Sequence, residues 1–135
     1  MKLVPIALSL AAIALISASG VAAAEVPAAP KDYQKLYDNC LKDAGPTNNG
    51  TVSACAEGVA DETKPEMNRL YQAITAKMNS PADAAKLEKA QKAWIVYRDN
   101  HCELAGSYVG SPMYYFCPMT LNIERVQQLR EMAGE

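Results

Sequence analysis

Residues 80–102 read SPADAAKLEKAQKAWIVYRDNHC, and this stretch predicts a helix from Pro81 to about Glu103. Ser80 is a natural N-cap, Pro81 suits the first helical position, and Asp83 adds a favourable charge in the first turn. Side chains then recur at three- and four-residue spacing along one face. That face carries Leu87, Ala90, Trp94 and Tyr97, and it continues to Arg98 and Cys102.

Working outward, the upstream sequence predicts two more helical regions. The first runs from Asp32 to about Ala44 and ends at Gly45-Pro46, because glycine accepts a left-handed cap and proline cannot continue the helix. The second covers residues 53–78, where we expect Pro65 to kink the helix or to start a new one.

Downstream, residues 106–117 break the helical periodicity. They contain two glycines and a proline, so we expect an ordered loop followed by a last helix that begins near Pro118 or Thr120. No segment has the alternation of a strand. The sequence predicts an all-α fold, a small disulfide-stapled bundle of four or five helices.

The four cysteines form two pairs of equal spacing, since Cys40 and Cys55 are separated by 15 positions and so are Cys102 and Cys117. Four cysteines allow three pairings. We expect the sequential one, because each loop closes locally and contributes about 3 kcal/mol in the chain-entropy model. A zinc site is disfavoured, because the chain has no C-x-x-C pair and His101 is its one histidine. We therefore expect no metal.

The N-terminus has the pattern of an export signal. Residues 1–24 contain one basic residue, an apolar stretch and a small-residue finish before Glu25, so we expect a signal peptide that is cleaved after Ala24. We expect a flexible lead-in over residues 25–31 and one domain over residues 32–135. A retained membrane anchor is the alternative, although serines and a glycine interrupt the apolar stretch. The expected location is periplasmic or secreted, with no stable membrane anchor.

Composition narrows the classes of partner. The chain has 13 Lys and Arg against 15 Asp and Glu, and residues 1–24 hold one lysine and no acid. The remainder therefore has a net charge of about −3. This mild acidity argues against a nucleic-acid partner, whose binding proteins usually carry a basic patch.

Catalytic patterns are weak, so we expect the protein not to be an enzyme and to need no cofactor. His101 lies beside Cys102, but sequence neighbours point about 100 degrees apart on a helix, and an oxidised cysteine has no thiolate. The carboxylates of Glu57, Asp61, Glu62 and Glu66 fit a solvated helix face better than a glycosidase pair.

Trp94 and Arg98 are expected to have structural roles. Both lie on the helix face that carries Cys102, where Trp94 would anchor the core. A buried guanidinium must be paired, so we expect Arg98 to bridge an acid and loop carbonyls and to fasten the disulfide loop. Its acid could be Glu124 or Glu57, and the sequence leaves both open.

Aromatic residues are concentrated between Cys102 and Cys117. Some must pack under the loop, whereas others are free for recognition, since tyrosines on a closed loop give broad amphipathic contact at low entropic cost. We take three tyrosines as candidate contacts: Tyr108, Tyr114 and Tyr115.

These features together resemble a known family. The run Q-x-x-W-x-x-Y-R-D-x-x-C over residues 91–102, the two cysteine pairs, and Thr120, Arg125 and Leu129 look like the lysozyme inhibitor LprI-like family of bacterial exported proteins. The similarity covers residues 36–129. It implies a helical, disulfide-bonded, periplasmic or secreted domain, although this chain lacks the lipid-anchor cysteine of the lipoprotein members.

We therefore expect an exported, non-enzymatic binding protein. The leading hypothesis is a lysozyme inhibitor whose disulfide loop, residues 103–117, blocks the cleft of a muramidase through Tyr108, Tyr114 and Tyr115. The alternative is an envelope structural or stress accessory protein that binds another envelope protein or cell-wall glycan.

Overall fold

The fold is known from a computed structural model that describes residues 29–135. The predicted signal peptide, residues 1–24, lies outside the described residues. Four helices make up the described part: α1 (Tyr33–Asp43), α2 (Asn49–Lys77), α3 (Pro81–Val109) and α4 (Met113–Ala133). The predicted all-α bundle is confirmed.

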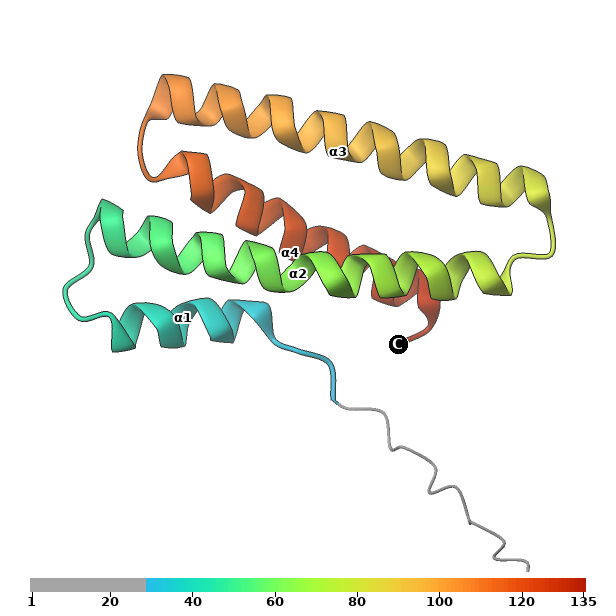
Figure 1. The fold of residues 1–135 in the computed structure, drawn as a ribbon, viewed down its shortest axis with the longest axis horizontal. Coiled ribbons are helices and arrows are strands. Elements are labelled where there is room, and N and C mark those ends of the chain that lie inside the picture. Colours follow the sequence, from blue (N-terminus) through green and yellow to red (C-terminus); the bar gives the residue numbers. More distant parts are fainter. Residues whose placement is uncertain (1–28) are drawn as a thin grey trace, which may run out of the picture.

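The helices form an elongated bundle around the α2–α4 pair (Figure 1). Helix α1 lies along the N-terminal half of α2, whereas α3 packs chiefly on α4 from the other side. Two hairpins result, α1–α2 and α3–α4. No helix between residues 29 and 135 is long and apolar enough to cross a membrane.

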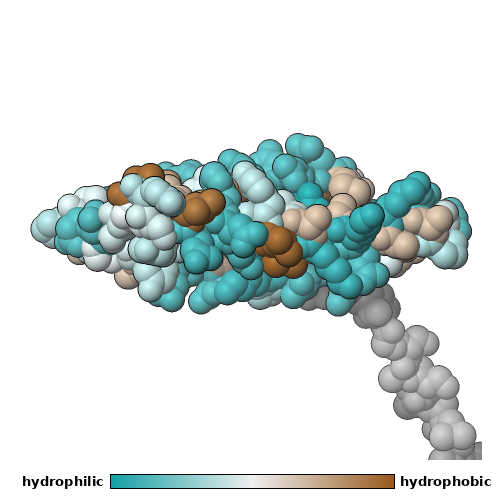
Figure 2. Space-filling view, turned by 90° about the horizontal axis from the view of Figure 1, so that it is seen from above, coloured by the Kyte–Doolittle hydropathy of each residue, from teal (hydrophilic) through white to brown (hydrophobic). Residues whose placement is uncertain are grey.

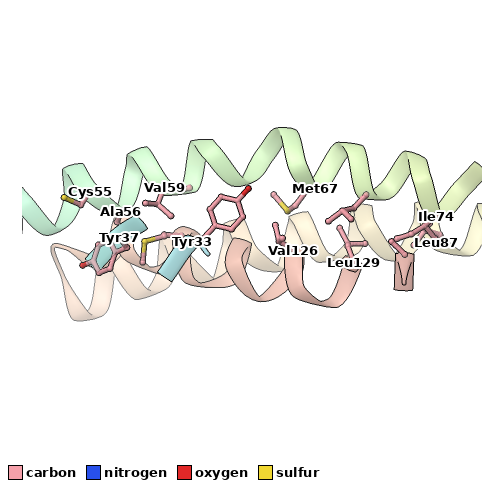
Figure 3. Packing of buried hydrophobic residues seen from close by; sticks show 14 residues of the cluster. Tyr33, Tyr37, Cys55, Ala56, Val59, Met67, Ile74, Leu87, Val126 and Leu129 are labelled. Atoms are coloured by element: carbon pink, nitrogen blue, oxygen red, sulfur yellow. The ribbon is translucent and has the colours of Figure 1, made fainter. Parts of the chain in front are cut away.

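The hydrophobic core lies where α2 faces α4 (Figure 3). Leu70 and Leu129 are fully buried, and α1 adds Tyr33 and Tyr37 to the core. Helix α3 adds little, since three of its 29 residues are buried: Leu87, Cys102 and Gly106.

Local signals placed several helix ends correctly. Helix α1 begins after its N-cap Asp32 and ends at Asp43, before Gly45 at φ +84°. Helix α3 begins at Pro81, where the Ser80 side chain accepts a hydrogen bond from the backbone N–H of Asp83.

The expectation that Pro65 starts a new helix was wrong. Helix α2 runs unbroken through Pro65. Proline has no backbone N–H, so the carbonyl of Asp61 lacks its helical hydrogen-bond donor. Both residues are exposed. The missing hydrogen bond therefore lies on the solvent-exposed face of the helix, where water can bond to the carbonyl. Helix α2 also begins earlier than expected, because Asn48 and Thr51 form a reciprocal capping box.

The expected loop over residues 106–117 was wrong as well. Helix α3 continues to Val109 and α4 begins at Met113, so only residues 110–112 form the turn. Gly106 does not break the helix: a Cβ at this position would lie 2.3 Å from the ring of Tyr114, so glycine permits close approach of the two helices. Helix α3 ends instead at Gly110, which has φ +92°.

Candidate functional site

The disulfides staple the two helical hairpins. Cys40 is bonded to Cys55 with a Cα–Cα distance of 5.7 Å, and Cys102 is bonded to Cys117 with a Cα–Cα distance of 5.4 Å. The predicted sequential pairing is confirmed. All four cysteines of the chain are oxidised, so His101 has no thiol beside it to activate.

His101 instead lies on the surface, where its ring stacks on Tyr97 with 5.4 Å between centroids. Among residues 29–135, no group of three His, Cys, Asp or Glu side chains is arranged to hold a metal ion.

The three candidate tyrosines gather at the end of the α3–α4 hairpin. Tyr108 lies in the last turn of α3 and is 86% exposed, whereas Tyr114 and Tyr115 lie in the first turn of α4 and are 52% and 44% exposed. Neighbouring Phe116 turns inward and packs on Tyr37, with 5.7 Å between ring centroids. The hairpin end is thus divided into an inward and an outward aromatic side.

A polar cleft of about 210 Å³ lies beside two of these tyrosines, and we call it the Arg98 cleft. Helices α2, α3 and α4 all contribute to its wall, so the cleft depends on the assembled bundle. Its polar and aromatic lining consists of Glu57, Asp61, Lys64, Arg98, Asp99, Tyr114, Tyr115 and Asn122. Tyr108 lies outside the cleft.

Arg98 is held in place by three groups. Its Nη1 donates to Oδ1 of Asn122 at 3.0 Å, while Nε and Nη2 donate to Oδ1 of Asp99 at 2.8 and 2.6 Å. The guanidinium carbon also lies 5.1 Å from the ring centroid of Trp94. The acid is therefore the adjacent residue Asp99, and neither Glu57 nor Glu124 takes this place.

Behind Arg98 lies a buried polar network that sequence analysis missed. Asn122 is 1% exposed, and its Nδ2 donates to Oγ1 of Thr63 at 3.0 Å and to the carbonyl of Ala60 at 3.3 Å. The Thr63 hydroxyl in turn donates to the Ala60 carbonyl at 2.6 Å. A signal existed, because Asn122 and Thr63 interrupt the apolar stripes of α4 and α2 at positions that face the core.

Trp94 lies at the edge of the core rather than inside it. Its indole is half-buried and packs against the core. Two guanidinium groups lie over the ring, that of Arg98 from the same helix at 5.1 Å and that of Arg125 from α4 at 5.7 Å. Burial lowers the pKa of Arg125, whose Nε donates to Oε1 of Gln91 at 2.9 Å. These contacts join α3 to α4 along the flank of the hairpin.

A second charged cluster, away from the Arg98 cleft, joins the N-terminus of α1 to α2 and α4. Glu66, which is 13% exposed, accepts hydrogen bonds from Arg130 Nε at 2.7 Å and from the Tyr33 hydroxyl at 2.5 Å. Burial, followed by the hydrogen bond to Glu66, raises the pKa of Tyr33. Glu66 therefore binds structural partners, while Asp61 and Glu62 make exposed ion pairs with Lys64 and Lys31.

A family model described as Lysozyme inhibitor LprI matches residues 40–129. The chain belongs to this family. The matched residues begin at Cys40, include all four cysteines and end at Leu129, so they contain the Arg98 cleft and the tyrosines at the hairpin end.

A relative in Rhizobium meliloti (strain 1021), the uncharacterized protein R02472, is 32% identical over 121 residues. The alignment covers 77% of this chain and 85% of the relative. No solved structure matches the chain significantly. Two disulfides and the family's export fit a protein that acts outside the cytoplasm.

Proposed function

We propose that this protein is an exported, non-enzymatic inhibitor of lysozyme, located in the periplasm or secreted. The observation that carries the proposal is the match to the lysozyme inhibitor family over residues 40–129, which includes the whole α3–α4 hairpin. The oxidation of every cysteine also supports a binding role over thiol catalysis.

The inhibitory surface in this proposal is the end of the α3–α4 hairpin. Tyr108, Tyr114 and Tyr115 are exposed on helices that the Cys102–Cys117 bond joins. Because these helices are already ordered, little conformational entropy is lost when the tyrosines enter an enzyme cleft.

Charge supports the same surface. Three carboxylates, those of Glu57, Asp61 and Asp99, line the Arg98 cleft with two cations, Lys64 and Arg98, so one negative charge is in excess there. Carboxylates at this position would steer a basic lysozyme towards the hairpin and would orient it there. Raising the ionic strength should therefore slow association more than it speeds dissociation.

The test is inhibition of c-type, g-type and bacterial lysozymes by the oxidised protein, compared with a triple variant in which Tyr108, Tyr114 and Tyr115 are alanine. We expect the native protein to inhibit at least one enzyme and the triple variant to lose that inhibition. The matched control is the double variant Leu36→Ala and Met132→Ala, which removes exposed apolar side chains elsewhere. Circular dichroism confirms that each variant is folded.

A second function, binding of cell-wall glycan, has support from the Arg98 cleft, because tyrosine faces beside carboxylates suit sugar rings. Co-sedimentation with peptidoglycan distinguishes the two. A protein that pellets with peptidoglycan but leaves every lysozyme active would be an envelope accessory protein, and inhibition without pelleting would exclude the glycan.

A further inference from the structure

Helix α3 has a stripe of side chains that face away from the hydrophobic core. It consists of residues at three- and four-residue spacing, all exposed: Ala90, Ala93, Tyr97, His101, Leu104 and Tyr108. We call these residues the α3 stripe. Because α3 buries only three of its 29 residues, most of the helix surface has no partner within the described chain.

The α3 stripe lies among several exposed apolar side chains of this helix, since Ile95, Val96 and Val109 are exposed beside it. Figure 2, which views the molecule from the α3 side, shows a largely hydrophilic surface broken by separate hydrophobic side chains. Tyr97, Leu104 and Tyr108 are 53%, 57% and 86% exposed. Helical spacing of such residues is the pattern by which one helix packs against another.

Side-chain size along the stripe indicates which helix would fit. The stripe has small residues before Tyr97 and large ones after it. In an antiparallel pair of α3 helices with its two-fold axis near Tyr97, Ala93 lies opposite His101 of the other copy and Ala90 opposite Leu104. Large side chains would then face small ones along the contact, as close packing requires.

Charge along the same flank is also self-complementary. Lys89 and Glu103 lie 14 positions apart, on one edge of the α3 stripe and on either side of Tyr97. Neither makes an ion pair with another side chain of residues 29–135. Two-fold symmetry would bring Lys89 of each copy close to Glu103 of the other, because an antiparallel pair aligns the same flank of both helices.

We propose that this protein self-associates through the α3 stripe, as a two-fold symmetric antiparallel pair of α3 helices from two copies. The stripe provides about six side chains per copy, compared with roughly 20–30 in an interface of standard size, so the dimer is weak and depends on concentration. The Arg98 cleft stays outside this contact, whereas Tyr108 belongs both to the α3 stripe and to the proposed inhibitory surface. The proposal does not rest on lysozyme binding, because self-association is measured without lysozyme.

The first experiment is sedimentation equilibrium of the oxidised protein from about 1 μM to about 1 mM, the range in which weak complexes form. The apparent mass should rise from one copy to two. A protein that stays monomeric at every concentration overturns the proposal.

Leu104→Asp tests the surface. We expect this variant to stay monomeric at all concentrations, whereas Met132→Asp, which changes a side chain of similar exposure on α4, should associate like the native protein. Circular dichroism should show both variants folded. Equal association of the native protein and Leu104→Asp would overturn the assignment. So would a native protein that stays monomeric while Leu104→Asp, but not Met132→Asp, loses lysozyme inhibition, because the stripe would then bind the enzyme and not a second copy.

A charge exchange tests the antiparallel orientation. Lys89→Glu and Glu103→Lys should each weaken association by about threefold to tenfold, because each creates two like-charge contacts per dimer. The double variant has the native net charge and should recover the native dissociation constant. Failure of the double variant to recover would exclude this arrangement of the two copies.

Discussion

The two disulfide hairpins have the same cysteine separation of 15 positions but use their tyrosines in opposite ways. In the α1–α2 hairpin, Tyr33 and Tyr37 are 3% and 6% exposed and belong to the core. In the α3–α4 hairpin, Tyr108 is almost fully solvated. Equal covalent closure therefore says nothing about whether a hairpin serves the core or presents a surface, and burial of its aromatic rings distinguishes the two roles.

The largest difference between the hairpins should appear when a buried tyrosine is removed. Tyr33→Ala should lower the free energy of unfolding by about 3–5 kcal/mol, because it leaves a large cavity and takes a donor from Glu66. Urea denaturation monitored by circular dichroism measures this loss. A loss below about 1 kcal/mol would mean that Tyr33 does not contribute to the core.

The two disulfides should contribute about equally to stability. Replacing Cys40 and Cys55 by alanine, or Cys102 and Cys117 by alanine, should each lower the unfolding free energy by about 3 kcal/mol, because the two closed loops are of equal length. Urea denaturation of the two double variants gives the comparison. Losses that differ by more than about 2 kcal/mol would show that native packing, and not loop entropy, sets the contribution.

The buried network joins the α3–α4 hairpin to α2 through Asn122. Asn122→Leu keeps the volume but leaves Arg98 and Thr63 without their shared partner, so the unfolding free energy should fall by about 1–3 kcal/mol. Chemical denaturation checks this value, with Asn39→Leu on the surface of α1 as control. An unchanged free energy of unfolding in Asn122→Leu would show that water replaces the amide as the partner of Arg98 and Thr63.

Alkaline pH should weaken the α1–α2 hairpin through Tyr33. Its pKa is raised in the folded protein, so its contribution is complete below the ordinary tyrosine pKa of about 10 and is lost as the pH rises towards the folded pKa. The slope of unfolding free energy against pH should approach about −1.4 kcal/mol per pH unit from this group. Urea titrations between pH 8 and 11 should show a shallower fall in Tyr33→Phe, and identical slopes would contradict this role.

The smallest effect on stability is expected at the exposed end of the second hairpin. Tyr108→Ala should change the free energy of unfolding by less than about 0.5 kcal/mol, since the side chain is 86% exposed. The same denaturation series measures it. A loss comparable with that of Tyr33→Ala would show that Tyr108 packs against the bundle.

Signals that act within one helical turn were sufficient for much of the fold. The cap at Ser80 and the end of α1 before Gly45 depend on neighbouring residues, and the sequence predicted both correctly. The equal cysteine spacing likewise led to the correct pairing.

Errors arose where a residue responds to a distant partner. Gly106 looked like a helix breaker, but it is glycine because the ring of Tyr114 packs against its Cα. In the candidate site, the sequence was sufficient to place the three tyrosines in the segment that the Cys102–Cys117 bond closes. The partners of Arg98 could not, because Asn122 comes from another helix and Asp99 competes with every other acid within reach.

The sparse burial of α3 determines how the native state fluctuates. With three of its 29 residues buried, this helix has few contacts to lose when it separates from α4. Its amide protons should therefore exchange with solvent at a lower opening free energy than those of α2, with the stapled end near Cys102 opening last. A second copy bound to α3 would suppress this opening, so the local stability of the protein would increase with its concentration.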